Sequence, residues 1–158
     1  MRSRRSTPRR ERNDAGIFGF EALPLFILVF VIGVLVFSES WAAIDAKIAA
    51  TSGAREAGPT FVESPANLGA AEAFSLASEA ARAAVSSHGR SGETTVEPVG
   101  VLSLERCARI TIQVSTETRY LALPFVRDSG FHRTVSATHT EIIDPFRDGL
   151  EGALGCVG

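Results

Sequence analysis

An apolar run that carries no charged residue extends from Ala22 to Ser38. Counted back to Ile17, with Glu21 as its only charge, the run is 21 residues long and ends at Phe37. As an α-helix, such a run covers about 30 Å, which is the thickness of the hydrocarbon core of a bilayer. A secretory signal peptide has a shorter apolar stretch followed by a small-x-small cleavage site, whereas Ser-Glu-Ser-Trp follows here. The run therefore predicts a transmembrane helix.

Basic residues gather before this run. Six of the sixteen Lys and Arg residues lie in the first twelve positions, whereas residues 39–158 hold ten basic and fifteen acidic residues, a net charge of −5. Because positive charge accumulates on the cytoplasmic side of a membrane helix, we expect a cytoplasmic N-terminus and an external C-terminal part. An arginine cluster also suits a nucleic-acid-binding arm, but no aromatic or motif context accompanies this one. We therefore expect membrane lipid, and no nucleic acid, as a partner.

The junction between the basic leader and the apolar run reads Gly16-Ile-Phe-Gly-Phe-Glu21. It resembles the class III signal of type IV pilins, in which Gly precedes a hydrophobic residue and Glu stands fifth after it. The resemblance implies that a prepilin peptidase cuts between Gly16 and Ile17. It also implies that Glu21 pairs with the new amine of Ile17 on a neighbouring subunit, because an unpaired carboxylate in a fibre core is costly. The alternative is that Glu21 lies among the lipid headgroups.

Helical character continues beyond the membrane run. Trp41, Ile44 and Ile48 recur at helical spacing as one apolar stripe, and the alanines around them favour helix. We predict one helix over residues 17–57, ended by Gly58-Pro59. Trp41 fits either an aromatic anchor at the membrane interface or a packing contact with the following domain.

A second helix is predicted to start at Ser64-Pro65, because Ser is a good N-cap and Pro suits the first helical position, and to run to about Ser87. Strands then follow a polar loop. Residues 94–102 are predicted as an edge strand because Pro98 interrupts them. Residues 108–115 alternate between apolar and polar side chains, and residues 131–143 form a third strand. Residues 120–126 are predicted as an apolar connector, and the tail from residue 144 is rich in glycine.

This order of elements predicts an α+β fold: a long N-terminal transmembrane helix, a second short helix and a small antiparallel sheet of about three strands packed on helix. The chain divides accordingly into a basic cytoplasmic leader, residues 1–16, a transmembrane and extended helix, residues 17–58, and an exported α+β domain, residues 59–158.

Cys107 and Cys156 are the two cysteines of the chain. In an oxidising compartment outside the membrane they are expected to form a disulfide, with two free thiols as the alternative. The closed loop of about fifty residues would contribute about 4 kcal/mol of stability by the loop-entropy estimate. The bond would tie the glycine-rich tail to a strand.

No residue pattern indicates catalysis or a cofactor. His132 and His139 have opposite parity on one predicted strand, so they are not expected to share a metal ion. Gly89-Arg-Ser-Gly92 lacks the spacing of a nucleophile elbow, and no phosphate-binding glycine loop is present. We therefore expect no catalytic residues, no metal site, no cofactor and no enzyme.

The pattern as a whole resembles the TadE-like minor pilins of Flp/Tad pilus systems. The residues that carry the resemblance are the Gly16…Glu21 start, Ala54-Arg-Glu-Ala57, Val135-Ser-Ala137 and the final Cys156. The sequence departs from this family where Ala22 stands in place of the Tyr that follows the Glu in the major pilin. Pro24 also lies closer to the Glu than is usual. With 142 residues after cleavage, counted from 158 less 16, the chain is too large for the major subunit.

The resemblance implies a minor pilin or pseudopilin that takes part in pilus assembly at the cell envelope. Its partners would be other pilin subunits, the prepilin peptidase and the Tad assembly machinery. Its location would be the cell membrane, in a single pass, with a possible place in the pilus. A single-pass membrane protein whose exported binding domain never enters a fibre is the first alternative, and a membrane-anchored enzyme is the second.

Overall fold

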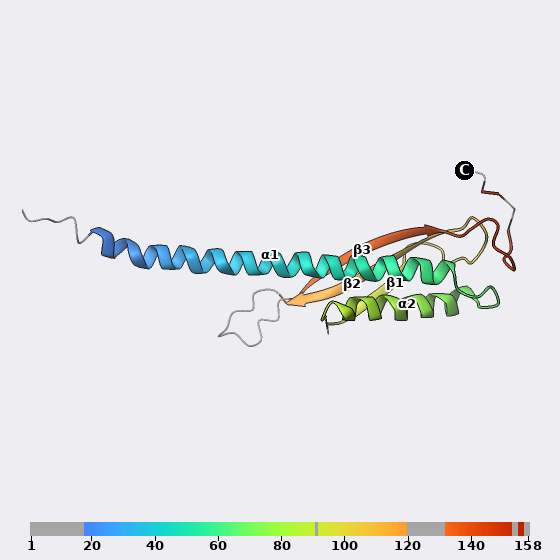
Figure 1. Ribbon diagram of the computed structural model, residues 1–158, viewed down its shortest axis with the longest axis horizontal. Helices are drawn as coiled ribbons and strands as arrows, with labels where there is room; N and C mark the ends of the chain where they lie inside the picture. Colours follow the sequence, from blue (N-terminus) through green and yellow to red (C-terminus); the bar gives the residue numbers. More distant parts are fainter. Residues whose placement is uncertain (1–17, 91, 120–131, 153–154, 157–158) are drawn as a thin grey trace, which may run out of the picture. The chain divides into compact units, whose positions relative to one another are not determined.

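The computed structural model describes residues 18–90, 92–119, 132–152 and 155–156. The chain forms two compact units, residues 1–38 and residues 39–158. The element order is α1 (Phe18–Val62), α2 (Ala70–Ser87), β1 (Thr94–Pro98), β2 (Arg109–Arg119) and β3 (His132–Ile142) (Figure 1). A long N-terminal helix, a second short helix and a three-stranded antiparallel sheet confirm the predicted α+β class.

The three strands form a meander in the order β1-β2-β3, with both pairings antiparallel. In the central strand, Ile110, Ile112 and Val114 are buried. The residues between them face the other side of the sheet, where the hydroxyl oxygens of Thr111 and Thr140 lie 2.8 Å apart. An antiparallel sheet with one buried and one polar face produces this alternation, so the strand predicted over residues 108–115 is confirmed, although it begins at Arg109 and continues to Arg119.

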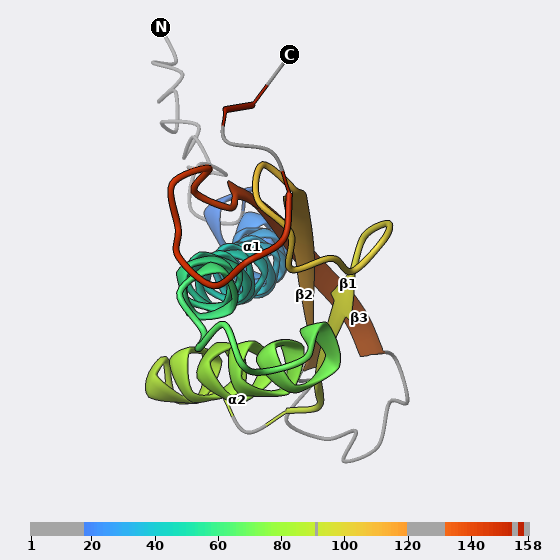
Figure 2. The ribbon, with the colours of Figure 1, turned by 90° about the vertical axis from the view of Figure 1, so that its right-hand side faces the viewer.

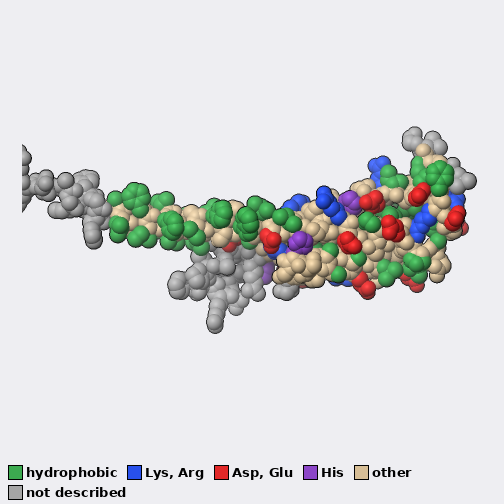
Figure 3. Space-filling model, in the orientation of Figure 1, with side chains coloured by type: hydrophobic (Ala, Val, Ile, Leu, Met, Phe, Trp, Pro, Cys, Tyr) green, Lys and Arg blue, Asp and Glu red, His purple; other side chains and the backbone are tan. Residues whose placement is uncertain are grey.

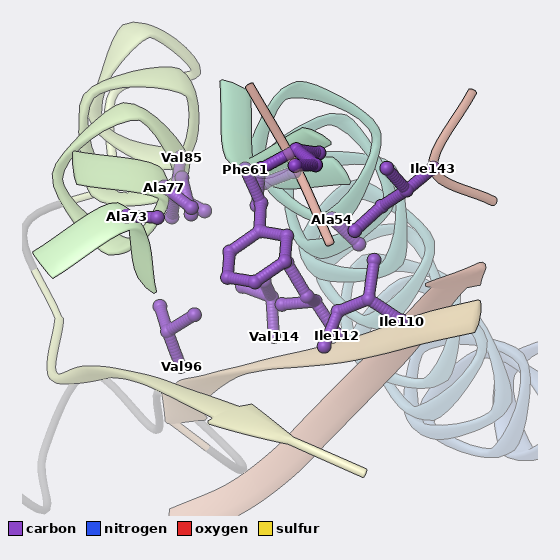
Figure 4. Close-up of a cluster of buried hydrophobic side chains, with 14 residues drawn as sticks. Ala54, Phe61, Ala73, Ala77, Val85, Val96, Ile110, Ile112, Val114 and Ile143 are labelled. Atoms are coloured by element: carbon purple, nitrogen blue, oxygen red, sulfur yellow. The ribbon is translucent and has the colours of Figure 1, made fainter. Parts of the chain in front are cut away.

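The buried face of the sheet is covered by the two helices, which lie beside each other on that side (Figure 2). Most of the side chains that the two helices contribute to the core are small. The buried apolar side chains of α1 are those of Ala46, Ala49, Ala50, Ala54, Ala57 and Phe61, and those of α2 include Ala73, Ala77, Ala81 and Val85. Figure 4 shows Phe61 between the α2 residues and the isoleucines of β2. Alanine faces let helix backbones approach closely, and Phe61 fills the wider space at one end.

The prediction that Gly58-Pro59 ends the first helix is wrong, because α1 continues to Val62. Gly58 serves close packing instead. A Cβ built at this position would lie 2.8 Å from Cγ of Glu141 and 2.9 Å from Cδ2 of His139, both in β3. Pro59 costs the helix about 3 kcal/mol, but the following turn buries Phe61 completely, a gain of similar size. The segment boundary predicted at residue 58 thus falls inside the helix.

The predicted start of the second helix is also wrong. The hydroxyl of Ser64 donates to the carbonyl of Phe61 at 2.7 Å and so serves the end of α1. Pro65 lies in a turn that the N–H of Leu68 closes on the Pro65 carbonyl at 3.0 Å. The N-cap of α2 is Gly69, whose N–H donates to the carboxylate of Glu72 at 3.2 Å. Ser64 and Pro65, which resemble a helix start in the sequence, therefore belong to the turn between α1 and α2.

The strand ends differ modestly from the prediction. The first strand ends at Pro98 rather than at residue 102, and Gly100 follows in a left-handed conformation with φ of 98°. Its position at the edge of the sheet is as predicted from Pro98. The third strand covers residues 132–142, and residue 131 and the connector predicted at residues 120–126 lie outside the described residues.

Candidate assembly surface

The residues predicted for processing and assembly lie at the start of the chain. Gly16 and Ile17 lie outside the described residues, and Glu21 lies in the first turn of α1. Cleavage after Gly16 and the pairing of Glu21 with a neighbouring amine therefore stay predictions.

The apolar part of α1 is long enough to cross a membrane. Its most apolar 18-residue window has a mean hydropathy of 2.5, and none of that window is buried within the chain. The large apolar side chains between Leu23 and Phe37 that are exposed keep 48–72% of their surface. A core helix of a water-soluble protein would bury such side chains, whereas a bilayer accepts them. The helix is therefore compatible with a single-pass membrane protein.

A second set of exposed apolar side chains lies on the part of α1 that belongs to the unit of residues 39–158. Trp41, Ile44 and Ile48 are 65%, 54% and 51% exposed, and we name these three residues the outer stripe. They are the apolar stripe that the sequence shows, but the domain core is formed by alanines on another side of the helix, such as Ala46 and Ala50. Trp41 is therefore not part of the buried core, and its two predicted roles, an anchor at the membrane interface or a packing contact with the domain, stay predictions.

Polar contacts fix the rotation of α1 on its domain. Nη2 of Arg90, in the loop after α2, donates to Oδ2 of Asp45 at 3.0 Å and to the carbonyl of Ala42 at 2.9 Å. On the other flank, Nζ of Lys47 donates to the carbonyl of Ser136 in β3. Because these contacts hold residues adjacent to the outer stripe against the domain, the stripe itself is kept turned outward.

A polar hollow of about 560 Å³ lies beside the first of these contacts and is lined by Asp45, His88, Arg90, Glu117 and Thr118, among others. Its charges are mostly matched internally. Asp45 pairs with Arg90, and Oε2 of Glu117 lies 3.7 Å from Nδ1 of His132, a contact that is an ion pair only when the imidazole is protonated. Within the described ranges, no group of three or more His, Cys, Asp or Glu side chains is placed to hold a metal ion. We assign no chemistry to this hollow.

A disulfide joins Cys107 to Cys156, the pair that the sequence analysis named, with an S–S distance of 2.06 Å and a Cα–Cα distance of 5.3 Å. Cys107 has a positive φ of 64° and lies in a β-bulge. The N–H of Cys107 donates to the carbonyl of Ile143, and the N–H of Ile143 donates to the carbonyl of Ala108, so two residues lie opposite one. The sequence gives no signal for this bulge, because Cys is not typical of a left-handed position.

The sequence reasoning also missed the contacts of Asp45 and Lys47, which join residues far apart in the chain and leave no local pattern.

Comparisons of the chain with family models, with curated proteins and with solved structures found no match in any of the three. Two exposed apolar surfaces thus lie on α1: the segment from Leu23 to Phe37, which is suited to lipid, and the outer stripe.

Proposed function

We propose that this chain is a TadE-like minor pilin or pseudopilin that takes part in assembling a Flp/Tad-type pilus. The observation that carries the proposal is the outer stripe. Trp41, Ile44 and Ile48 are large apolar side chains on the helix of a domain with a complete core of its own, and more than half of each is exposed. A membrane anchor alone could place Trp41 at the interface, but Ile44 and Ile48 extend the stripe further along α1, and a helix that packs against neighbouring subunits would cover all three side chains.

The spacing of the stripe suits a neighbouring helix. Steps of three and four residues place successive side chains along one line of contact, and from Trp41 to Ile48 the helix rises about 10 Å. Covering the exposed half of each isoleucine would gain about 1 kcal/mol. A neighbour that emerges from the same membrane in the same direction would run parallel to α1, as pilin helices do.

The leader supplies the second support. Six arginines precede Gly16, and Glu21 follows at the position that a prepilin signal requires. Under the proposal, the peptidase removes residues 1–16 on the cytoplasmic side and the new amine of Ile17 on one subunit meets Glu21 of the next. The C-terminal domain lies outside the membrane, and the subunit is held in the membrane by one pass until assembly.

The alternative is a single-pass membrane protein whose exported domain binds a partner and never enters a fibre. It keeps the same orientation but needs neither cleavage nor a covered outer stripe. Cross-linking distinguishes the two. A photoreactive residue in place of Ile44 is expected to give adducts with pilin subunits in cells, whereas the same residue in place of Leu76, an exposed leucine of α2, is not.

Substitution gives a second measurement of the same surface. Ile44→Glu is expected to reduce the number of pili strongly with the protein still present, because a carboxylate would have to be buried between helices. Leu76→Glu, the matched control, is expected to leave pili at the level of the unaltered protein. Normal pili with Ile44→Glu, together with no adduct at position 44, would reject the proposal and leave the single-pass binding protein.

A further inference from the structure

A groove of about 420 Å³, lined by both polar and aliphatic groups, lies at the end of the domain where α1 meets the turn to α2. Three segments line it: the turn between the helices, the connection from β1 to β2, and the C-terminal tail. We name it the leucine groove after Leu68, Leu102, Leu104 and Leu150. The first three leucines are only half-buried, so part of their aliphatic surface is exposed in the groove, beside the polar groups of Ser103, Glu105 and Glu151.

Two carboxylates flank this surface. Glu105 and Glu151 line the groove, and the N–H of Arg106 donates to the carbonyl of Glu151 at 2.9 Å, which brings the two segments together. Both glutamates are exposed, and neither has an ion-pair partner among the residues that the structure describes. Figure 3 shows acidic and apolar side chains close together at this end of the domain.

The nearby arginines are occupied elsewhere. Nε of Arg106 donates to the carbonyl of Arg147 at 3.0 Å, and its Nη1 donates to the carbonyl of Gly152 at 3.3 Å. Nη2 of Arg147 donates to the carbonyl of Ser64. Because both guanidinium groups are directed at backbone oxygens, neither is placed to pair with Glu105 or Glu151. The rim of the groove therefore keeps its negative charge available to a partner.

The groove is also held in one shape. The disulfide between Cys107 and Cys156 ties the tail to the β1–β2 connection. Gly149 has a positive φ of 80°, and a Cβ there would lie 3.0 Å from Cβ of Ala66, so the tail approaches the interhelical turn at a position that suits glycine alone. A surface fixed in this way loses little conformational entropy when a ligand binds.

We propose that the leucine groove docks a segment of a partner protein in which a large aliphatic or aromatic side chain is flanked by Lys or Arg. The aliphatic side chain would cover the leucines, and the flanking cations would meet Glu105 and Glu151. Charge complementarity selects this occupant, since an acidic or uncharged segment would leave both carboxylates unpaired. The inference concerns residues remote from the outer stripe and does not depend on the chain being a pilin.

The test uses the full chain in lipid nanodiscs and two probe peptides of nine residues, each with two central leucines. One peptide carries two lysines on each side, and the other carries glutamates in the same places. Binding is followed by NMR of leucine methyl groups. The lysine peptide is expected to shift the methyl signals of Leu102 and Leu104 at concentrations at which the glutamate peptide does not.

Charge reversal identifies the carboxylates responsible. Glu105→Lys with Glu151→Lys is expected to weaken the lysine peptide by up to about fivefold per site and to create binding of the glutamate peptide. Glu79→Lys, an exposed glutamate on α2, is the control and is expected to change neither affinity. Intact folding of each variant is checked by the presence of the disulfide.

Three results would overturn the inference. The first is equal binding of both peptides by the unaltered chain. The second is methyl shifts confined to leucines outside the groove. The third is self-association of the chain without peptide that the double reversal abolishes, because this would assign the groove to a second copy.

Discussion

Gly53 of α1 lies so close to Val85 of α2 that a Cβ at position 53 would come within 2.8 Å of Cγ2 of the valine. The same Cβ would lie 3.0 Å from the carbonyl oxygen of Ala81 and 3.3 Å from Cγ1 of Val114. Gly53 therefore lies where α1 closely approaches both α2 and the central strand. The alanines on both helices complete a contact in which the backbones themselves are near neighbours.

Gly53→Ala is expected to lower the free energy of unfolding of the domain by about 1–3 kcal/mol, because the new methyl group overpacks the contact. Thermal unfolding of the chain in detergent is the measurement. Gly33→Ala is the matched control, since nothing lies within 4 Å of a Cβ in that position of the same helix. Addition of Val85→Ala to Gly53→Ala should recover part of the loss if the clash with Val85 is its cause, and no recovery would rule that cause out.

Pro59→Ala is expected to stabilise the domain by about 1 kcal/mol. Alanine supplies the N–H that the helix lacks at this position, and this gain exceeds the entropy that proline removes from the unfolded chain. Pro65→Ala, in the turn after α1, gains no helical hydrogen bond and is expected to lower stability slightly. Urea titrations of the two variants measure the difference. A loss of stability with Pro59→Ala would show that proline does not weaken the last turns of α1.

Removal of the disulfide by Cys107→Ser with Cys156→Ser is expected to cost about 4 kcal/mol, because the residues that it joins are 49 positions apart. Unfolding in urea, with and without reductant, is the measurement, and reductant should affect the unaltered chain but not the variant. Digestion of protein taken from the envelope should yield the two cysteines in one linked peptide. Free thiols at both positions would show that the bond is not formed there.

The orientation of the chain is tested by a reporter that is active only outside the cytoplasm. Fused after Gly158, it is expected to be active, because the arginine cluster precedes the apolar run and the net acidic part follows it. A silent reporter at this point, together with activity of a cytoplasmic one, would reverse the predicted topology.

Glu21→Ala tests the assembly role predicted for this carboxylate. The change removes a charge from the edge of the apolar run, so membrane insertion should be as good or better. Pilus formation should nevertheless fail, because the amine of Ile17 on the next subunit loses its partner, at a cost of several kcal/mol. Glu39→Ala, at the other end of the run, is the control and should leave pili unchanged.

Gly16→Glu tests cleavage. It should block the cut after residue 16, and the N-terminal residue of the protein is the measurement. Normal pili with Glu21→Ala and a chain uncut at Gly16 would favour the single-pass alternative.

The sequence predicts this fold well where a pattern is local. The central strand is predicted correctly because Ile110, Ile112 and Val114 alternate with polar residues. The long apolar helix is predicted correctly because no charge interrupts residues 22–38. It fails at the end of α1, where Gly58-Pro59 resembles a stop. Contacts with β3 and the burial of Phe61, both remote in sequence, decide the outcome there.

The large apolar residues of α1 did not predict which face of the helix is buried in the domain. Trp41, Ile44 and Ile48 carry the stronger apolar signal, yet the core takes the alanines, because a close helix contact favours small side chains. No pattern in the sequence predicted the leucine groove either. Its leucines come from three segments that lack helical or strand periodicity, and only the fold and the disulfide bring them together.

Lys47 is the sole lysine of the chain, and it donates to the carbonyl of Ser136 in β3. The hydrogen-bonded pairing of Ala108 with Ile143 alternates along the ladder, so Ser136 directs its backbone groups away from β2, toward the open side of the sheet. Among the residues that the structure describes, no strand pairs with this outer edge of β3, and an unpaired edge of eleven residues is a template on which a foreign strand can add and start aggregation. A strand that pairs with this edge of β3 must first displace the ammonium group of Lys47 from the carbonyl of Ser136. Acetylation of this one amine would therefore make the domain of residues 39–158 more prone to aggregate, although its core would be unchanged.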